Sequence, residues 1–166
     1  ILGVVATRAT KMWPLENYEK LAHLIRERTD YKVIIPLSDN LVDRNIEKVL
    51  LQHGLPENVT ILKASISELP TRLSNSKFYI GNDTGLKHLS ISLGIKTYTF
   101  FGPEPPMEWH PYDPEQHPYF YKQPLECRTK DAHYCGLSEC ESMICLNEFL
   151  PEDIFKSIFE SKEKGE

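Results

Sequence analysis

Apolar runs alternate with segments of helical periodicity along most of the chain. Strands are predicted by short apolar runs over residues 1–6, 32–37, 59–62, 77–81 and 96–102. The segments between these runs place apolar residues three and four positions apart, as amphipathic helices do. Strands and helices that alternate in this way form parallel sheets with right-handed crossovers. The pattern therefore predicts an α/β fold: a doubly wound, Rossmann-like parallel sheet with helices on both faces.

Capping and stop signals place the helices. They are predicted over residues 14–28, 43–53, 65–75 and 86–94, and one amphipathic helix with a frayed tail is predicted over 150–166. Pro14 suits the first turn of a helix, and Gly54 is a stop signal. Ser65 and Glu68 have the spacing of a capping box. Each of the first four predicted strands is therefore followed by a helix that can cross back over the sheet.

Ligands of open parallel sheets bind beyond the carboxyl ends of the strands. There, after the fourth predicted strand, residues 81–85 read Gly-Asn-Asp-Thr-Gly. Both glycines are expected to permit backbone conformations that other residues avoid, Thr84 offers a hydroxyl, and the following helix points its first N–H groups outward. His88 adds a donor, so the turn is a candidate anion site. The alternative is a tight turn in which Asp83 or Thr84 caps the helix and His88 lies on the surface.

The loop after the first strand carries polar side chains at the same edge of the sheet, namely Thr7, Arg8, Thr10 and Lys11. In the usual strand order 3-2-1-4-5 this loop faces the turn after strand four. Lys11 is then expected to neutralise a diphosphate whose other side rests on the helix that begins at Gly85. The loop contains no glycine, so the dinucleotide fingerprint is missing and a nicotinamide enzyme is a poor second choice. Trp13 is interpreted as a packing residue.

Composition and charge exclude several classes of protein. With 166 residues and 40% apolar residues, the chain is predicted to be a single domain over 1–166. It opens directly in an apolar strand, which indicates a fragment of a longer protein. The net charge of −5 and scattered basic residues argue against nucleic acid as a partner. No apolar run approaches the roughly 20 residues of a membrane span, so no transmembrane segment and a cytoplasmic location are expected.

Three segments together resemble a known family. They are KMWPLENYEKLAHLI, YIGNDTGLKHLSISLG and TFFGPEPPMEWHPY. In this order and spacing they resemble the second half of bacterial glycosyltransferase family nine, the heptosyltransferases that build the lipopolysaccharide core. The resemblance covers nearly the whole chain and implies the C-terminal, nucleotide-sugar-binding domain of a GT-B enzyme. The N-terminal acceptor-binding domain would then be absent from this fragment.

The resemblance also implies donor-binding residues. Lys11 falls on the lysine that contacts the donor phosphates, and Thr7 keeps a hydroxyl beside it where Ala6 does not. The motif that holds the diphosphate and neighbouring sugar hydroxyls falls on Asp83, Thr84, Gly85 and His88.

At two positions the sequence departs from the family pattern. The acidic residue that usually holds the ribose aligns with Val42, so the neighbouring Asp43 is taken as the donor-binding residue, with Asp39 nearby. The position that packs against the base aligns near Ala64, a smaller residue. These departures leave the nucleobase open.

The activity implied by the resemblance is inverting glycosyl transfer from an ADP-heptose-like donor to a lipopolysaccharide-core or other glycan acceptor. The family needs no metal or other cofactor, and its general base is an aspartate of the first domain. We therefore expect no catalytic residue in this fragment, which would bind the donor without turnover. The full-length protein is expected at the inner face of the inner membrane as a peripheral protein.

A cysteine-rich loop over 127–145 is the remaining feature, with Cys127, Cys135, Cys140 and Cys145 around His133. Four thiols could bind zinc, but the spacings lack a Cys-x-x-Cys pair, so free thiols are the leading interpretation. Trp109 and His110 in the Pro-rich loop before it are interpreted as ordinary packing residues.

Two other function classes stay open. The same fold could be a non-catalytic nucleotide- or phosphate-binding module, and the cysteines could build a metal-stabilised interaction domain. An upstream Rossmann-like half bearing an aspartate would favour the enzyme over the binding module, and metal analysis would test the cysteines.

Overall fold

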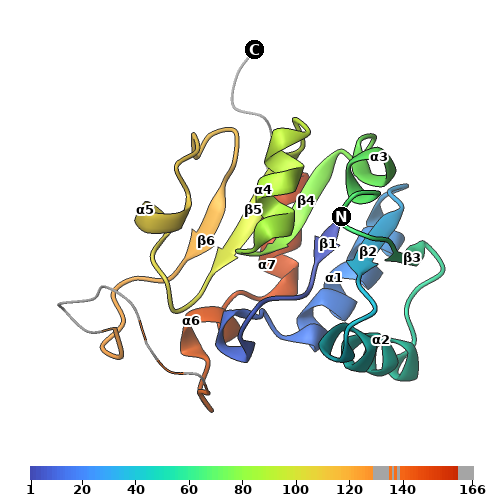
Figure 1. The fold of residues 1–166 in the computed structure, drawn as a ribbon. Helices are drawn as coiled ribbons and strands as arrows, with labels where there is room; N and C mark the ends of the chain where they lie inside the picture. The colour runs from blue at the N-terminus through green and yellow to red at the C-terminus, as the bar shows by residue number, and fades with distance from the viewer. Residues whose placement is uncertain (129–134, 136, 138, 161–166) are drawn as a thin grey trace.

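The computed structural model describes residues 1–128, 135, 137 and 139–160, whose path is shown in Figure 1. The strands are β1 Leu2–Gly3, β2 Val33–Leu37, β3 Val59–Lys63, β4 Phe78–Asn82, β5 Lys96–Phe101 and β6 Tyr119–Tyr121. The longer helices are α1 Leu15–Arg28, α2 Leu41–His53 and α4 Gly85–Ser92. Shorter helical segments are η1 Ala9–Lys11, α3 Leu69–Leu73, α5 Pro106–Trp109, α6 Ile144–Asn147, α7 Pro151–Phe155 and η2 Lys156–Glu160.

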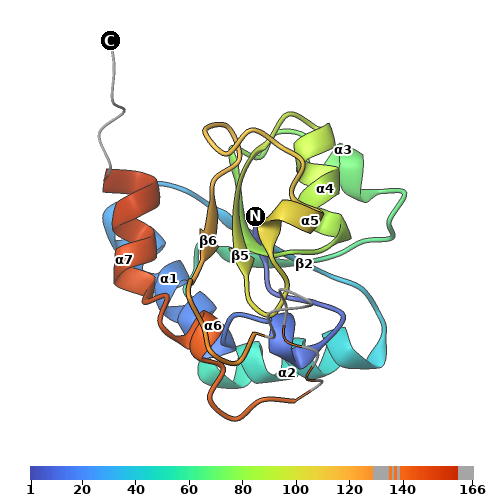
Figure 2. The same ribbon diagram turned by 90° about the vertical axis from the view of Figure 1, so that its left-hand side faces the viewer.

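The strands lie in the spatial order β3-β2-β1-β4-β5-β6. Hydrogen bonds join β1, β4, β5 and β6 in one parallel ladder and β2 and β3 in another. The two ladders meet where β1 and β2 lie side by side (Figure 1). Helices α1 and α7 cover one face, and α3 and α4 cover the other (Figure 2). The predicted doubly wound parallel sheet and the order of its first five strands are confirmed.

Strand β1 is shorter than predicted, because side chains replace a neighbouring strand as partners of its backbone. The strand was expected over residues 1–6 but covers Leu2–Gly3. The Tyr18 hydroxyl donates to the Gly3 carbonyl at 3.1 Å, and the Asn82 side-chain amide donates to the Val4 carbonyl at 2.9 Å. Side-chain donors therefore satisfy these carbonyls where the ladder ends.

The predicted helix stops are confirmed, whereas one predicted start is wrong by a few residues. Gly54 at φ 87° and Gly94 at φ 75° follow α2 and α4 in the left-handed region that glycine tolerates. Helix α2 begins before Asp43, because Asn40 caps it by accepting a hydrogen bond from the Asp43 N–H at 2.9 Å.

Two other predicted helices differ in length or form. The helix predicted over 65–75 is reduced to α3, because Ser65 and Glu68 form a separate turn before it. In that turn the Glu68 carboxylate accepts from the Ser65 N–H at 2.9 Å, which is the predicted capping contact. The C-terminal helix is present but widens from α7 into the π-helical segment η2. The tail predicted to fray, 161–166, lies outside the described residues.

Aromatic packing fixes the loop after β1 to the centre of the core. Trp13 is fully buried, stacks on Phe100 of β5 at 4.4 Å between ring centroids, and meets Tyr18 of α1 edge-on at 4.8 Å. Its indole N–H donates to the Phe149 carbonyl at 3.0 Å. The packing role predicted for Trp13 is confirmed, and it gives the neighbouring polar residues a rigid base.

Candidate donor-binding site

Buried hydrogen bonds hold the turn after β4, residues 81–85, against the loop after β1. Asn82 is fully buried, and its side-chain oxygen accepts from the Trp13 N–H at 2.9 Å and from the Tyr18 hydroxyl at 3.0 Å. The Tyr79 hydroxyl donates to the Asn82 carbonyl at 2.7 Å. The two loops predicted to face one another therefore do so, and Asn82 is the residue that joins them.

The two glycines of this turn serve a purpose other than the one predicted. The left-handed glycines among the described residues are Gly54 and Gly94, so the special backbone conformation expected at Gly81 and Gly85 is wrong. A Cβ atom at Gly81 would lie 2.7 Å from the Gly3 Cα atom, whereas a Cβ atom at Gly85 would meet nothing within 4 Å. Gly81 thus permits close packing of β1 against β4, and Gly85 leaves open space.

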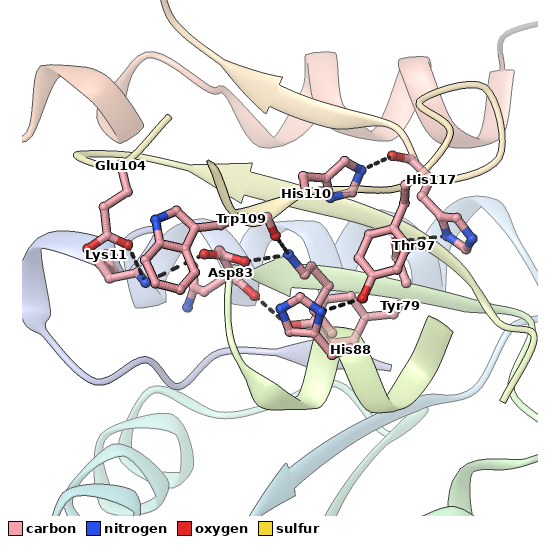
Figure 3. Close-up of polar contacts among 12 residues, drawn as sticks. Lys11, Tyr79, Asp83, His88, Thr97, Glu104, Trp109, His110 and His117 are labelled. Atoms are coloured by element: carbon pink, nitrogen blue, oxygen red, sulfur yellow. Dashed lines mark hydrogen bonds and ion pairs between the residues drawn. The ribbon is translucent and has the colours of Figure 1, made fainter. Parts of the chain in front are cut away.

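A chain of charges runs across the facing loops. The Lys11 ammonium lies 2.7 Å from Glu104 Oε2 and 3.5 Å from Asp83 Oδ2, so it stands between two carboxylates (Figure 3). Glu104 also pairs with Arg8 through its other oxygen. Three of these side chains are largely buried, with 14% of Lys11, 7% of Asp83 and 19% of Glu104 exposed. The ion pairs are therefore screened less by salt than pairs on the open surface.

Lys87 is a second, fully buried cation behind the turn. Its ammonium donates to Asp83 Oδ1 at 2.5 Å and to the Trp109 carbonyl at 2.9 Å. It also lies over the Phe101 ring, 5.1 Å from the centroid. Burial lowers the pKa of Lys87, while the contact with Asp83 opposes that change. Lys87 therefore fixes one oxygen of Asp83 and leaves the other toward Lys11.

A cleft of about 870 Å³ opens at the carboxyl ends of β1, β2 and β3 and reaches the first turn of α4. Of the predicted donor-binding residues, Thr7, Asp43, Thr84 and Gly85 line it. The other three do not line the cleft: Asp83 belongs to the turn itself, Lys11 contacts Asp83, and His88 follows the turn on α4. Thr84 makes no side-chain cap hydrogen bond to α4, so the predicted capping alternative is not what this residue does.

Apolar side chains line the part of the cleft near α2. Leu41, Val42 and Ile66 are 70%, 55% and 85% exposed and belong to its lining. The Asp43 carboxylate accepts from the Ser38 N–H at 2.6 Å and from the Asn40 side-chain amide at 3.0 Å.

Asp43 is thus engaged with its own loop, and Val42 and Ala64 complete a wall of mostly apolar character. Such a wall suits a flat, uncharged ring better than a phosphate.

Three histidines form a cluster with Tyr112 on the far side of Lys87. His88 Nδ1 lies 2.6 Å from the Tyr112 hydroxyl. His110 Nε2 donates to the His117 carbonyl at 2.7 Å, a contact drawn in Figure 3. In the described part of the chain His110 Nδ1 has no partner. Burial lowers the pKa of His88, His110 and His117 below 6.5, and the Lys87 charge lowers it further for the first two. His88 is therefore a neutral hydrogen-bonding group at pH 7.

We expect the free energy of unfolding to fall as the pH decreases from 7 to 5. His110 has a lower pKa in the folded protein than in the unfolded chain, so its neutral form stabilises the folded protein fully above pH 6.5. This contribution is lost as the pH falls through the pKa of the folded protein. The limit is about 1.4 kcal/mol per pH unit for each histidine. Urea unfolding at several pH values measures this slope, to which buried His110 should contribute most.

Two variants test the assignment of the pH effect. His110→Gln keeps a donor for the His117 carbonyl but does not titrate, so it should flatten the acid slope. His23→Gln, on the exposed face of α1, is the matched control and should leave the slope unchanged. An equal slope in wild type and His110→Gln would contradict the account.

The cysteines are not assembled into a metal site within the described residues. Cys127, Cys135, Cys140 and Cys145 are free thiols, and in that part of the chain no group of three or more histidine, cysteine or acidic side chains is placed to hold a metal ion. His133 lies outside the described residues. The choice between free thiols and a metal site therefore stays a prediction.

Sequence reasoning missed Asn82, Lys87 and Glu104. Lys87 lies four residues after Asp83 on a helix, a spacing that indicates an ion pair. Glu104 follows β5 at the edge of the sheet that carries Lys11, and this position could have identified it. Neither Trp109 nor His110 lines the cleft. The packing role predicted for His110 is confirmed, because it is buried and packs edge-on against Phe101, whereas the one predicted for Trp109 is wrong, since its side chain is 50% exposed.

Relatives of known sequence match part of the chain. Lipopolysaccharide heptosyltransferase 1 of Salmonella typhimurium is 28% identical over 100 residues, which cover 60% of this chain and 31% of that protein. The protein of the same name from Escherichia coli K12 is 27% identical over 100 residues, covering 60% and 30%. The chain thus spans about a third of the length of these curated relatives. In its described part, no helix is both long and apolar enough to span a bilayer.

Solved structures share the fold over nearly the whole chain. E. coli heptosyltransferase WaaC with ADP-2-deoxy-2-fluoro heptose matches 97% of this chain and 42% of its own, with a TM-score of 0.69 and 21% identity. E. coli ADP-heptose lps heptosyltransferase II matches with a TM-score of 0.72 and 18% identity, over 93% and 43% of the two chains. The family model described as glycosyltransferase family 9 (heptosyltransferase) matches residues 3–135. Because this match covers most of the sequence, the chain belongs to glycosyltransferase family 9.

Proposed function

We propose that this chain is the donor-binding domain of an inverting glycosyltransferase and holds the diphosphate of a nucleotide sugar between Lys11 and the first turn of α4. The observation that carries the proposal is the contact of Lys11 with Asp83 at 3.5 Å, because Asp83 directly precedes Thr84 and Gly85, which line the cleft. A lysine ammonium and the N-terminus of a helix are both suited to bind phosphate. The apolar wall at Leu41 and Val42 would receive the nucleoside.

The proposed reaction needs charge stabilisation more than covalent chemistry. An acceptor hydroxyl attacks the anomeric carbon, the new glycosidic bond forms, and the bond from that carbon to the diphosphate oxygen breaks with inversion. Negative charge develops on the leaving diphosphate, where Lys11 and the α4 N–H groups would stabilise it. The acceptor proton passes to a general base, which we assign to an aspartate of a preceding domain. No divalent metal is needed in this scheme.

The relatives suggest the substrates. Two of them are named lipopolysaccharide heptosyltransferases, and one structural neighbour holds ADP-2-deoxy-2-fluoro heptose. We therefore propose an ADP-heptose-like donor and a lipopolysaccharide-core or other glycan acceptor bound through the preceding domain. The full-length enzyme would act in the cytoplasm, at the inner face of the inner membrane. The domain alone would bind the donor without turnover.

We expect Lys11→Ala to weaken nucleoside diphosphate binding about 10- to 150-fold, the value of a charged hydrogen bond, and nucleoside binding less than twofold. Calorimetric titration with the diphosphates of adenosine, uridine and guanosine and with the matching nucleosides measures both effects. Exposed Lys20→Ala on α1 is the control. Equal losses of affinity for diphosphates and nucleosides would show that Lys11 does not bind the phosphates.

The same titrations test the metal-free scheme. The affinity for the diphosphate in the presence of EDTA should equal the affinity without it, because groups of the protein neutralise the phosphate charge. A strict requirement for added magnesium would contradict the scheme and indicate metal-bridged phosphate recognition.

A further inference from the structure

Glu104 contacts the lysine to which the proposed function assigns the donor diphosphate. Its Oε2 atom lies 2.7 Å from the Lys11 ammonium, and its Oε1 atom pairs with Arg8. Lys11 lies farther from Asp83, at 3.5 Å, and the Oδ1 atom of Asp83 is held at 2.5 Å by Lys87. Glu104 is therefore the principal anion at Lys11, and a phosphate group that approaches Lys11 must replace or share this contact.

The backbone around Glu104 is held in place. A Cβ atom at Gly102 would lie 3.0 Å from Leu146 and 3.2 Å from the Thr10 carbonyl oxygen, so this segment packs closely on the loop after β1. The Gly102 carbonyl accepts from Arg128 at 2.5 Å, and Pro103 follows directly with its fixed φ. The carboxylate is thus carried by a fixed backbone and can leave Lys11 by side-chain rotation alone.

Charge decides how strongly Glu104 opposes each ligand. The group contains three side-chain cations and two carboxylates, so its net charge is +1. The cations are Arg8, Lys11 and Lys87, and the carboxylates are those of Asp83 and Glu104. A free nucleoside diphosphate carries about one more negative charge at pH 7 than its sugar ester, because its terminal phosphate ionises a second time with a pKa near 6. The repulsion by Glu104 is therefore larger for the released diphosphate than for the sugar donor.

We infer that Glu104 is a specificity-determining residue that weakens binding of the free nucleoside diphosphate product more than binding of the nucleotide-sugar donor. The inference rests on the proposed function and adds to it a means of product release. If the extra phosphate charge of the free diphosphate lies about 6 Å from the Glu104 carboxylate, their repulsion changes the binding constant by about threefold in water. At an effective dielectric constant of 20 the change is about a hundredfold. Glu104 is 19% exposed, so we expect an effect between these limits.

The test compares ADP with ADP-glucose on wild type and Glu104→Gln, which removes the charge and keeps the shape. We expect the Kd of ADP to fall about tenfold more than that of ADP-glucose, so that the variant shifts selectivity toward the product. Glu108→Gln, exposed on α5, is the control and should change neither Kd. Inorganic pyrophosphate, which also lacks the sugar ester, should follow ADP.

The outcomes separate the inference from the function on which it rests. Equal tightening of ADP and ADP-glucose, or no change in either, would overturn the inference while leaving diphosphate binding intact. Weaker binding in Glu104→Gln would overturn it too, because Glu104 would then position the cations for the ligand. If neither protein bound ADP, ADP-glucose or pyrophosphate, the proposed function would fail and the inference with it.

Discussion

Lys87→Met should lower the free energy of unfolding by about 3 to 5 kcal/mol, the usual effect of removing one partner from a buried ion pair. Methionine fills a similar volume, but Asp83 Oδ1 and the Trp109 carbonyl lose the ammonium that lies 2.5 Å and 2.9 Å away. Among the described residues, Asp83 would then be a buried carboxylate with only the more distant Lys11 as a charged partner. Urea unfolding at pH 7 measures the loss, which is a large share of the 5 to 15 kcal/mol typical of a domain.

A double variant separates the charge from the packing. Lys87→Met with Asp83→Asn removes both charges, and it should recover at least about 1 kcal/mol relative to Lys87→Met alone. Lys20→Met, exposed on α1, is the control and should be neutral within about 0.5 kcal/mol. A loss below about 1 kcal/mol for Lys87→Met would contradict the role of Lys87 as the buried partner of Asp83.

Gly85→Val should abolish diphosphate binding in a protein that remains folded. The backbone of Gly85 is not in the left-handed region, and an added Cβ atom meets nothing within 4 Å, so valine causes no strain. Its side chain would instead enter the cleft at the start of α4, where the phosphate is proposed to lie. Calorimetric titration measures binding, and circular dichroism checks the fold.

Two milder variants give the contrast that the proposal requires. Gly85→Ala adds a single methyl group and should weaken binding less than Gly85→Val. Thr84→Ala removes one hydroxyl and should cost about 0.5 to 1.5 kcal/mol of binding, or up to about 3 if the bond is to a charged phosphate. A folded Gly85→Val protein with normal binding would mean that the turn only starts the helix.

The sequence predicted the sheet because its central strands are continuous apolar runs, which burial on both faces requires. It could not predict the early end of β1, since the Gly3 and Val4 carbonyls are taken by side chains from α1 and β4. Strand β6 was also missed, because Tyr119–Tyr121 is too short to give a periodic signal and follows Pro118. The early end of β1 and the formation of β6 both depend on contacts between residues that are distant in sequence.

The candidate site was predictable in its motif and less so in its electrostatics. Periodicity and turn chemistry predicted that the loop at Lys11 would face the turn at Gly85. They did not predict that Glu104 would neutralise Lys11, because the two residues meet only when β5 lies two strands away from β1. The conformational reason expected for Gly85 was wrong, since a Gly-Asn-Asp-Thr-Gly turn can form without a left-handed residue at its end.

A crystal structure of this chain with a bound nucleoside diphosphate tests the central claim most directly. The account predicts phosphate oxygens about 2.7 to 3.1 Å from the Lys11 ammonium and from N–H groups in the first turn of α4, with Glu104 displaced from Lys11. The base would lie against the apolar wall at Leu41 and Val42. A diphosphate bound elsewhere, with the contact between Lys11 and Glu104 intact, would contradict the account.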